Sequence, residues 1–184
     1  MRRLFVTGIT SLDGYINDDT GNFDWAEPSA EVHAFVNARE RPIGTHLYGR
    51  RLYETMRYWE TAGGPEDTAV EREWAELWRG IDKIVYSSTL DEVTTTRTRL
   101  ERRFDPDAVR ALKESLPHDF SIGGAALAAE AFRAGLVDVV QQYVNPVVVG
   151  GGTRFLPDGV RLDLELTDER RFGNGVVFLE YRVR

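Results

Sequence analysis

Short apolar runs alternate with amphipathic stretches along most of this chain of 184 residues. Apolar runs of about four to eight residues bounded by turn residues indicate buried strands, whereas apolar residues three and four positions apart indicate helices. The strand-like runs are residues 4–9, 46–49, 83–86, 94–100, 120–122 and 137–149. The helical patterns are residues 30–41, 50–56, 70–81, 106–116 and 125–134. Strands that alternate with helices in this order predict an α/β fold on a mostly parallel sheet.

The C-terminal residues follow a different pattern. Residues 161–167 and residues 177–183 each alternate between apolar and polar side chains, with a Gly-Asn-Gly turn at 173–175 between them. Such a turn between two alternating runs predicts an antiparallel hairpin. Pro146 lies inside the run 137–149 and cannot donate a ladder hydrogen bond, so a bulge or a sheet edge is expected there. We therefore predict a three-layer sandwich with a mostly parallel central sheet and an antiparallel C-terminal hairpin.

Capping residues mark the start of two helices. Ser29 can accept a hydrogen bond from the first turn of the helix that follows it. Asp105 can do the same for the next-to-last helix, with Pro106 at the first helical position. No internal repeat or linker interrupts the pattern, which predicts a single domain over residues 1–184.

Composition narrows the range of partners. The formal net charge is −7, which argues against a nucleic-acid or anionic-membrane binder because such partners attract basic surfaces. The chain has no cysteine, which excludes disulfides and thiol nucleophiles and fits a reducing compartment. No apolar run approaches the roughly 20 residues of a spanning helix. We expect a cytoplasmic protein that binds a small molecule and has no nucleic-acid or membrane partner.

The carboxyl ends of three predicted strands share one kind of sequence. Each run stops at small or hydroxyl residues, at 48–50, 87–89 and 123–125. These ends meet at one edge of a parallel sheet, where ligands usually bind. Glycine leaves room for a pyrophosphate, hydroxyls donate to phosphate oxygens, and arginine offers a bidentate fork. The pattern predicts a site for an anionic cofactor, although each segment taken alone is also compatible with a simple turn.

Other familiar sites are absent from the sequence. Neither the G-x-G-x-x-G pattern nor the Walker A pattern occurs, and His33, His46 and His118 lack the spacing of metal ligands. No serine lies in a G-x-S-x-G motif. Asp13 and Glu54 lie near the predicted edge and are candidates for proton transfer. The alternative reading is a turn-forming aspartate and a solvated helix glutamate.

Five segments together resemble a known family. They are residues 10–16, 47–54, 85–90, 122–127 and 145–152. Taken in this order, they resemble the dihydrofolate reductase-like superfamily, and specifically the reductase domain at the C-terminal end of the bifunctional riboflavin-biosynthesis deaminase-reductase. The chain is similar to a stand-alone member of that family. The resemblance spans nearly the whole chain and is specific because all five segments occur in the family's order.

The resemblance implies an NADPH-dependent reductase with a dihydrofolate reductase-like fold. It implies that Gly49 and Arg50 form a turn over the cofactor phosphates, and that Ser87 and Ser88 contact the adenosine 2′-phosphate. The residues implied at the pyrophosphate are Gly123, Gly124, Ala125 and Leu127. The implied chemistry is hydride transfer to a C=N or C=O carbon of a small, pyrimidine- or pterin-like substrate. No metal is implied.

Ile9 and Gly14 are implied near the nicotinamide, with Asp13 or water delivering the proton. The position aligned with the proton-donating carboxylate of folate reductases offers His33, with Glu31 two residues earlier, which argues against folate reduction. The cysteine-free chain has no deaminase signature. The open alternatives are a true dihydrofolate reductase and a non-catalytic nucleotide-binding module. A homodimer is expected, as in relatives.

Overall fold

The structure is a computed structural model that describes residues 1–184. The strands are β1 (Leu4–Thr10), β2 (Tyr15–Asn17), β3 (Ile43–Gly49), β4 (Asp82–Tyr86), β5 (Thr98–Glu101), β6 (Asp119–Gly123), β7 (Val139–Val144), β8 (Thr153–Arg154), β9 (Leu164–Arg171) and β10 (Val177–Val183). The helices are α1 (Ala30–Glu40), α2 (Arg50–Met56), α3 (Ala69–Gly80), α4 (Pro106–Ser115) and α5 (Ala125–Arg133), with short 3-10 helices η1 (Asp24–Ala26) and η2 (Arg57–Glu60).

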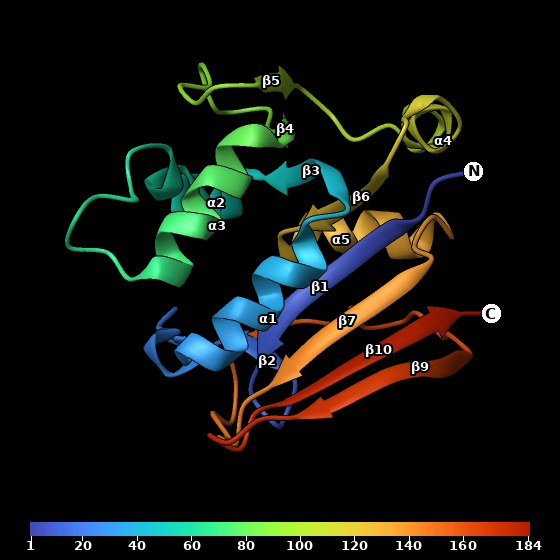
Figure 1. Ribbon diagram of the computed structural model, residues 1–184. Helices are drawn as coiled ribbons and strands as arrows, with labels where there is room; N and C mark the ends of the chain where they lie inside the picture. The colour runs from blue at the N-terminus through green and yellow to red at the C-terminus, as the bar shows by residue number, and fades with distance from the viewer.

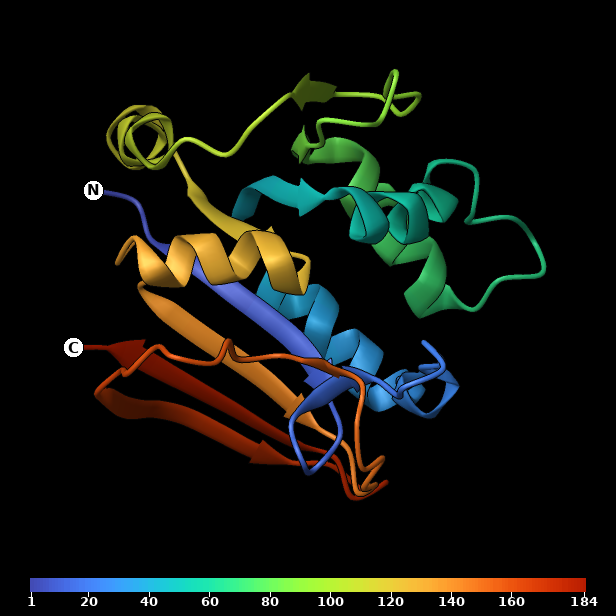
Figure 2. The same ribbon diagram turned by 180° about the vertical axis from the view of Figure 1, so that it is seen from behind.

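Eight strands form one twisted sheet in the order β5-β4-β3-β6-β1-β7-β10-β9. The first six are parallel to one another, and β10 pairs antiparallel with both β7 and β9. Helices α1 and α3 lie on one side of the sheet (Figure 1), and α5 lies on the other side, where the long segment after β7 also crosses (Figure 2). The predicted three-layer sandwich with a parallel centre and an antiparallel C-terminal hairpin is confirmed.

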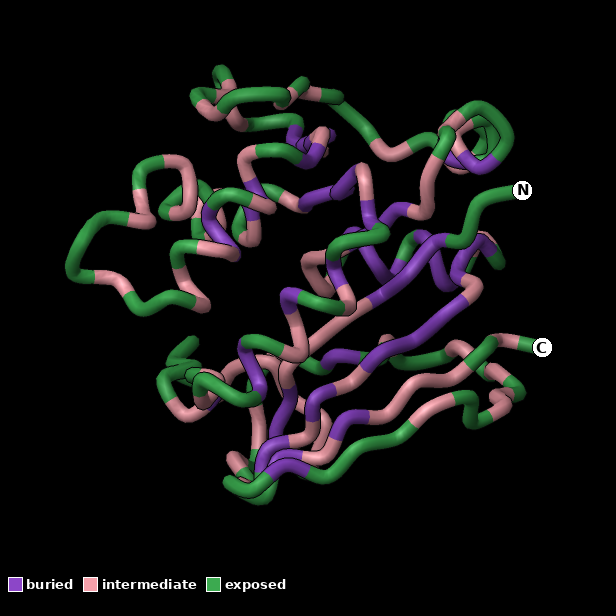
Figure 3. Tube along the Cα trace, in the orientation of Figure 1, coloured by how far each residue is buried: buried purple, intermediate pink, exposed green.

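Alternate residues of the central strands supply two apolar layers. Leu4 and Val6 of β1 pack with the face of α5 that carries Ala128 and Phe132, in the largest core cluster. The opposite face contributes Tyr143 to a cluster with Val32 of α1. No residue of β1 or β7 is exposed and most are buried, whereas β10 is mostly half-buried and β9 is largely exposed (Figure 3). The centre of the sheet is therefore covered by apolar side chains on both faces, as expected for parallel strands.

The structure corrects two boundary predictions. Strand β7 ends at Val144, so Pro146 lies beyond the strand and makes neither a bulge nor an edge; β7 is an interior strand between β1 and β10. The ladder stops just before the residue that has no N–H to donate. Strand β9 covers 164–171 rather than 161–167, because the hairpin turn pairs Val177 with Arg171 and fixes the register from that end.

Both predicted helix caps are present. Ser29 accepts the N–H of Val32 at 3.4 Å and caps α1, and Asp105 accepts the N–H of Asp107 at 3.0 Å and caps α4. The polar run predicted as a strand over residues 94–100 forms only the short edge strand β5 over Thr98–Glu101, because the N–H groups of Thr94 and Thr96 donate to the side chains of Tyr53 and Glu60. No helix is long and apolar enough to span a bilayer, and no three acidic or histidine side chains are grouped to hold a metal ion.

Candidate functional site

The carboxyl ends of four neighbouring strands form one continuous edge. Tyr48 of β3 is in register with Gly123 of β6, and Gly49 is in register with Tyr86 of β4. Strand β1 lies on the other side of β6. The residues predicted for the cofactor therefore lie at adjoining strand ends, as the sequence pattern required. They are Ile9, Gly14, Gly49, Arg50, Ser87, Ser88, Gly123, Gly124, Ala125 and Leu127.

Two glycines bring the β3 and β6 ends into direct backbone contact. Gly124 has φ +92°, and a Cβ there would lie 3.4 Å from Cα and N of Gly49. A Cβ at Gly123 would lie 2.4 Å from Cδ2 of Leu52 in α2. Glycine is thus required by backbone conformation at position 124, whereas at position 123 a larger residue would displace the end of the Leu52 side chain. A larger residue at position 124 would strain the protein with or without a ligand.

Helices α2 and α5 start at this edge without a capping side chain. The other three α-helices are capped by Ser29, Thr68 and Asp105, whereas α2 and α5 follow Gly49 and Gly124 and have no side-chain cap and no acidic residue in the first turn. An uncapped first turn leaves backbone N–H groups available and favours negative charge. Both uncapped starts lie side by side, so this edge suits an anion.

Arg50 reaches across the edge toward the end of β4. Its Nη1 donates to the Thr89 hydroxyl at 2.8 Å, and its Nε donates to Glu54 Oε1 at 2.8 Å. Ser87 is buried, and its hydroxyl accepts the N–H groups of Thr89 and Leu90 at 3.2 and 2.9 Å. The Ser87 hydroxyl therefore shapes the turn. Ser88 is exposed, makes no side-chain hydrogen bond within the protein, and is the serine free to meet a ligand.

Asp13 fastens the loop after β1 to the segment after β7. Its carboxylate accepts the N–H groups of Val149 at 3.2 Å and Gly150 at 2.8 Å. The Ser11 hydroxyl, followed by these backbone N–H groups, lowers the pKa of Asp13 against the opposing effect of desolvation. An ionised acceptor is suited to anchoring the loop. Proton donation by Asp13 is a prediction that this geometry disfavours.

The same two segments are joined again beyond Gly14. Asn17 Oδ1 accepts the N–H of Thr153 at 3.0 Å, and the short strands β2 and β8 pair there. Gly152 has φ +122°, and a Cβ on it would lie 2.0 Å from the Asn17 carbonyl oxygen. The loop after β1 is therefore held at both of its ends.

Replacing Asp13 by Ala is expected to loosen this connection, because two N–H groups lose their acceptor. Amide hydrogen exchange should become faster at Val149 and Gly150, while the amides of β6 keep their protection. Unchanged exchange at both residues would show that the carboxylate does not hold the loop.

The structure adds a residue that the sequence prediction missed. Arg51 lines a cavity of about 500 Å³ with Gly152, Thr153 and the turn 17–21. Its guanidinium makes no hydrogen bond or ion pair within the protein. In the sequence only the dipeptide Arg50-Arg51 points to this residue. The fold shows that the two side chains differ, because Arg50 binds Glu54 and Thr89 whereas Arg51 has no partner within the protein.

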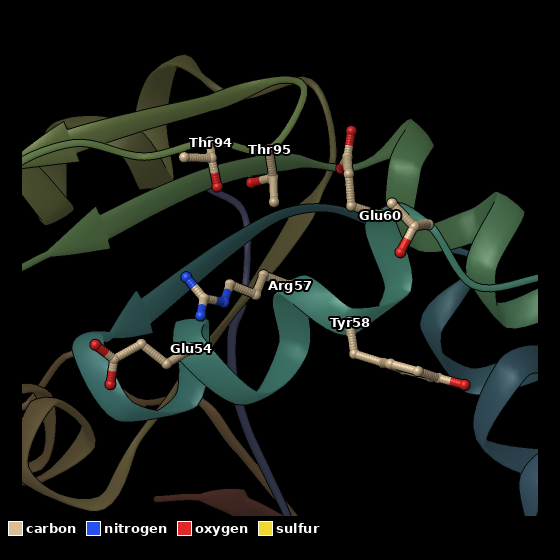
Figure 4. A pocket seen from close by; sticks show the side chains of 7 residues that line it. Glu54, Arg57, Tyr58, Glu60, Thr94 and Thr95 are labelled. Carbon is tan, nitrogen blue, oxygen red and sulfur yellow. The ribbon is translucent and has the colours of Figure 1, made fainter.

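A second cavity lies between α2–η2 and the segment after β4. It measures about 390 Å³, and Glu54 and Arg57 project from α2 and η2 opposite Thr94 and Thr95 (Figure 4). Behind these threonines, the buried Tyr53 hydroxyl accepts the N–H of Thr94 at 2.9 Å. Glu54 is thus shared between this cavity and the contact with Arg50.

The α1 residues considered for proton donation are engaged elsewhere. Glu31 accepts from Arg170 Nη2 at 3.0 Å and from the N–H of Gly173 at 3.3 Å, which ties it to the C-terminal hairpin. His33 is buried with its ring 6.1 Å from that of Trp59, and burial lowers its pKa although Glu71 and Glu73 oppose this. Neither residue offers an available carboxylic acid.

Comparison with known proteins identifies the family to which this chain belongs. The model of the RibD C-terminal domain matches residues 2–178. The uncharacterized protein YyaP of Bacillus subtilis (strain 168) is 29% identical over 184 residues, which cover 98% of this chain and 94% of YyaP.

Two solved structures share the fold. The diaminohydroxyphosphoribosylaminopyrimidine deaminase/5-amino-6-(5-phosphoribosylamino)uracil reductase of Thermotoga maritima superposes with a TM-score of 0.71 at 16% identity, over 100% of this chain and 57% of that one. A dihydrofolate reductase of Enterococcus faecalis, solved with NADP(H), superposes with a TM-score of 0.63 at 15% identity, over 99% of this chain and 96% of the other. The fold is dihydrofolate reductase-like, and by the match over residues 2–178 this chain belongs to the RibD C-terminal domain family.

Proposed function

We propose that this protein is an NADPH-dependent reductase that acts on a C=N or C=O group of a small, pyrimidine- or pterin-like substrate. The observation that carries the proposal is the pair of uncapped helix starts, at Gly49 and Gly124, on one strand edge. Membership of the RibD C-terminal domain family and the fold shared with two reductases support it.

The residues at the edge fit the cofactor. The first turn of α5 would hold the pyrophosphate with backbone N–H groups of Ala125 and Leu127, while the Leu127 side chain packs into the core. Arg50 and the exposed Ser88 would meet the 2′-phosphate. When bound, NADPH supplies the hydride.

The chain's own contribution would be positioning and exclusion of water. In this proposal Gly14, in the loop after β1, and Ile9, next to the last residue of β1, would lie beside the cofactor, where backbone groups would orient the nicotinamide. In this proposal the ionised Asp13 anchors the loop, and solvent delivers the proton to the product.

The proposal favours a riboflavin-pathway type of substrate over folate. Folate reduction in relatives relies on a carboxylate in the first helix, and here Glu31 is bound to the hairpin while His33 is buried against Trp59.

Thermal unfolding with and without nucleotide tests this function. NADPH is expected to raise the midpoint of unfolding because it binds the folded state alone, and NADH at the same concentration should raise it less. NADPH oxidation across a set of cyclic imines and carbonyl compounds would then identify the substrate. If neither nucleotide shifts the midpoint, the proposed function is wrong.

A further inference from the structure

Arg50 differs from the other cations of α2 and η2 in having a carboxylate partner. Its ion pair with Glu54 joins Nε to Oε1 at 2.8 Å. The side chains of Arg51 and Arg57 make no ion pair or hydrogen bond, although both line cavities close to the same helix. The pairing is therefore selective for the arginine that faces the end of β4.

The Arg50–Glu54 pair is poorly arranged to stabilise α2. Arg50 is the first residue of the helix and Glu54 lies four residues later, in the last turn of a seven-residue helix. Positive charge at a helix start and negative charge near its end both oppose the helix dipole, and Arg-to-Glu is the weaker order for an i,i+4 pair. Helix stability does not account for this arrangement.

The pair instead reduces the net positive charge at the strand edge where we propose that the cofactor binds, because Glu54 offsets the charge of Arg50. Glu54 occupies Nε and Thr89 occupies Nη1, so Nη2 is the part of the Arg50 fork without a partner in the protein. An anion that binds this guanidinium next to Ser88 would also lie within a few ångströms of the Glu54 carboxylate. With both side chains about one-third to one-half exposed, the repulsion would be weakened by solvent but not abolished.

We propose that Glu54 determines nucleotide specificity at this site: by partly neutralising Arg50, it lowers the affinity for a ribose 2′-phosphate relative to a 2′-hydroxyl. This inference rests on the proposed function. A 2′-phosphate carries close to two negative charges and is repelled by the carboxylate, whereas a 2′-hydroxyl can donate a hydrogen bond to it. The protein would therefore distinguish NADPH from NADH less strongly than Arg50 alone would allow.

The Glu54→Gln variant tests the charge while keeping the shape of the side chain. We expect NADPH to bind about threefold to tenfold more tightly, with NADH affinity changed less than about twofold. Dissociation constants from isothermal titration provide the readout, and the gain should shrink at high salt. Glu114→Gln is the matched control, since Glu114 is exposed on α4 and its side chain makes no hydrogen bond or ion pair within the protein.

A double variant separates the effect of the Arg50–Glu54 pair from the general effect of removing one negative charge near the site. In an Arg50→Ala background, Glu54→Gln should no longer favour NADPH by the same factor, because the partner that Glu54 neutralises is gone. Unchanged or weaker NADPH binding by Glu54→Gln, with the wild type binding normally, would overturn this inference and leave the proposed function intact. Equal tightening of both nucleotides would also overturn it, because Glu54 would then act on a phosphate that they share. Absence of binding to the wild type would overturn both.

Discussion

Replacing Glu40 by Ala is expected to lower the free energy of unfolding by about 1–3 kcal/mol, because it leaves a buried imidazole N–H without its acceptor. Glu40 ends α1 and is 7% exposed, and His46 on β3 is 3% exposed. Glu40 Oε2 lies 3.1 Å from His46 Nε2. Without the carboxylate, the buried His46 Nε2 would lose its hydrogen-bond partner.

The contact belongs to a longer chain of hydrogen bonds. Trp78 Nε1 of α3 donates to the Tyr48 hydroxyl at 3.1 Å, and that hydroxyl is hydrogen-bonded to His46 Nδ1. With the proton on Nε2 donated to Glu40, the imidazole Nδ1 accepts from Tyr48, and every member has a partner. Burial raises the pKa of Tyr48, which keeps its hydroxyl protonated and able to donate. The network connects α1, β3 and α3 across one layer of the fold.

Urea unfolding of three variants measures this effect. Glu40→Gln should cost less than Glu40→Ala, since the amide oxygen can still accept from His46. Glu114→Ala on the surface of α4 should change stability by no more than about 0.5 kcal/mol. A loss below about 1 kcal/mol for Glu40→Ala would show that the imidazole is satisfied in another way and would contradict the network.

The elements that the sequence predicted correctly are those with local causes. Helix α2 begins directly after Gly49, and α4 begins at Pro106 directly after its cap Asp105, because a cap or a glycine decides the start within a few residues. Glycine, hydroxyl and arginine residues at strand ends predicted the candidate site because parallel strands bring their carboxyl ends together. Here three-dimensional proximity follows from topology alone.

What the sequence does not predict depends on contacts between distant parts of the chain. The place of Asp13 after β1 is compatible with a proton donor or with a turn-forming residue, and its hydrogen bonds to Val149 and Gly150 involve residues 136 and 137 positions away. The cavity beside Arg51 requires the turn 17–21 to meet Gly152. The hydrogen bond from Trp78 to the Tyr48 hydroxyl joins residues 30 positions apart and carries no motif. Composition and periodicity contain no information on such pairings.

Lys83 provides the second large prediction, through the pH dependence of stability. It is 1% exposed at the start of β4, and its Nζ donates to the carbonyl oxygens of Trp78 at 2.8 Å and Ile81 at 2.7 Å. The ammonium also lies 4.1 Å from the centroid of the Trp78 ring. Burial lowers the pKa of Lys83 to about 8, although Glu60 and Asp82 favour its charged form.

The direction of the pH dependence follows from the pKa of Lys83 in the folded and the unfolded protein. The unfolded chain keeps the ordinary lysine pKa of about 10.4, so between pH 8 and that value it binds more protons than the folded protein does. Stability contributed by Lys83 therefore rises with pH across this window, by about 1–2 kcal/mol from pH 7.5 to 9.5 after allowance for solvent screening. Below pH 7.5 this group should contribute little change.

Urea unfolding at both pH values, for the wild type and for Lys83→Met, isolates this contribution. The methionine fills a similar volume and cannot titrate, so the wild-type curve should rise with pH relative to the variant. The variant also loses two donors to the Trp78 and Ile81 carbonyls and can be less stable at every pH. The diagnostic quantity is therefore the difference in slope. Parallel slopes would mean that Lys83 keeps its ordinary pKa and that the two carbonyls and the indole ring fully compensate its burial.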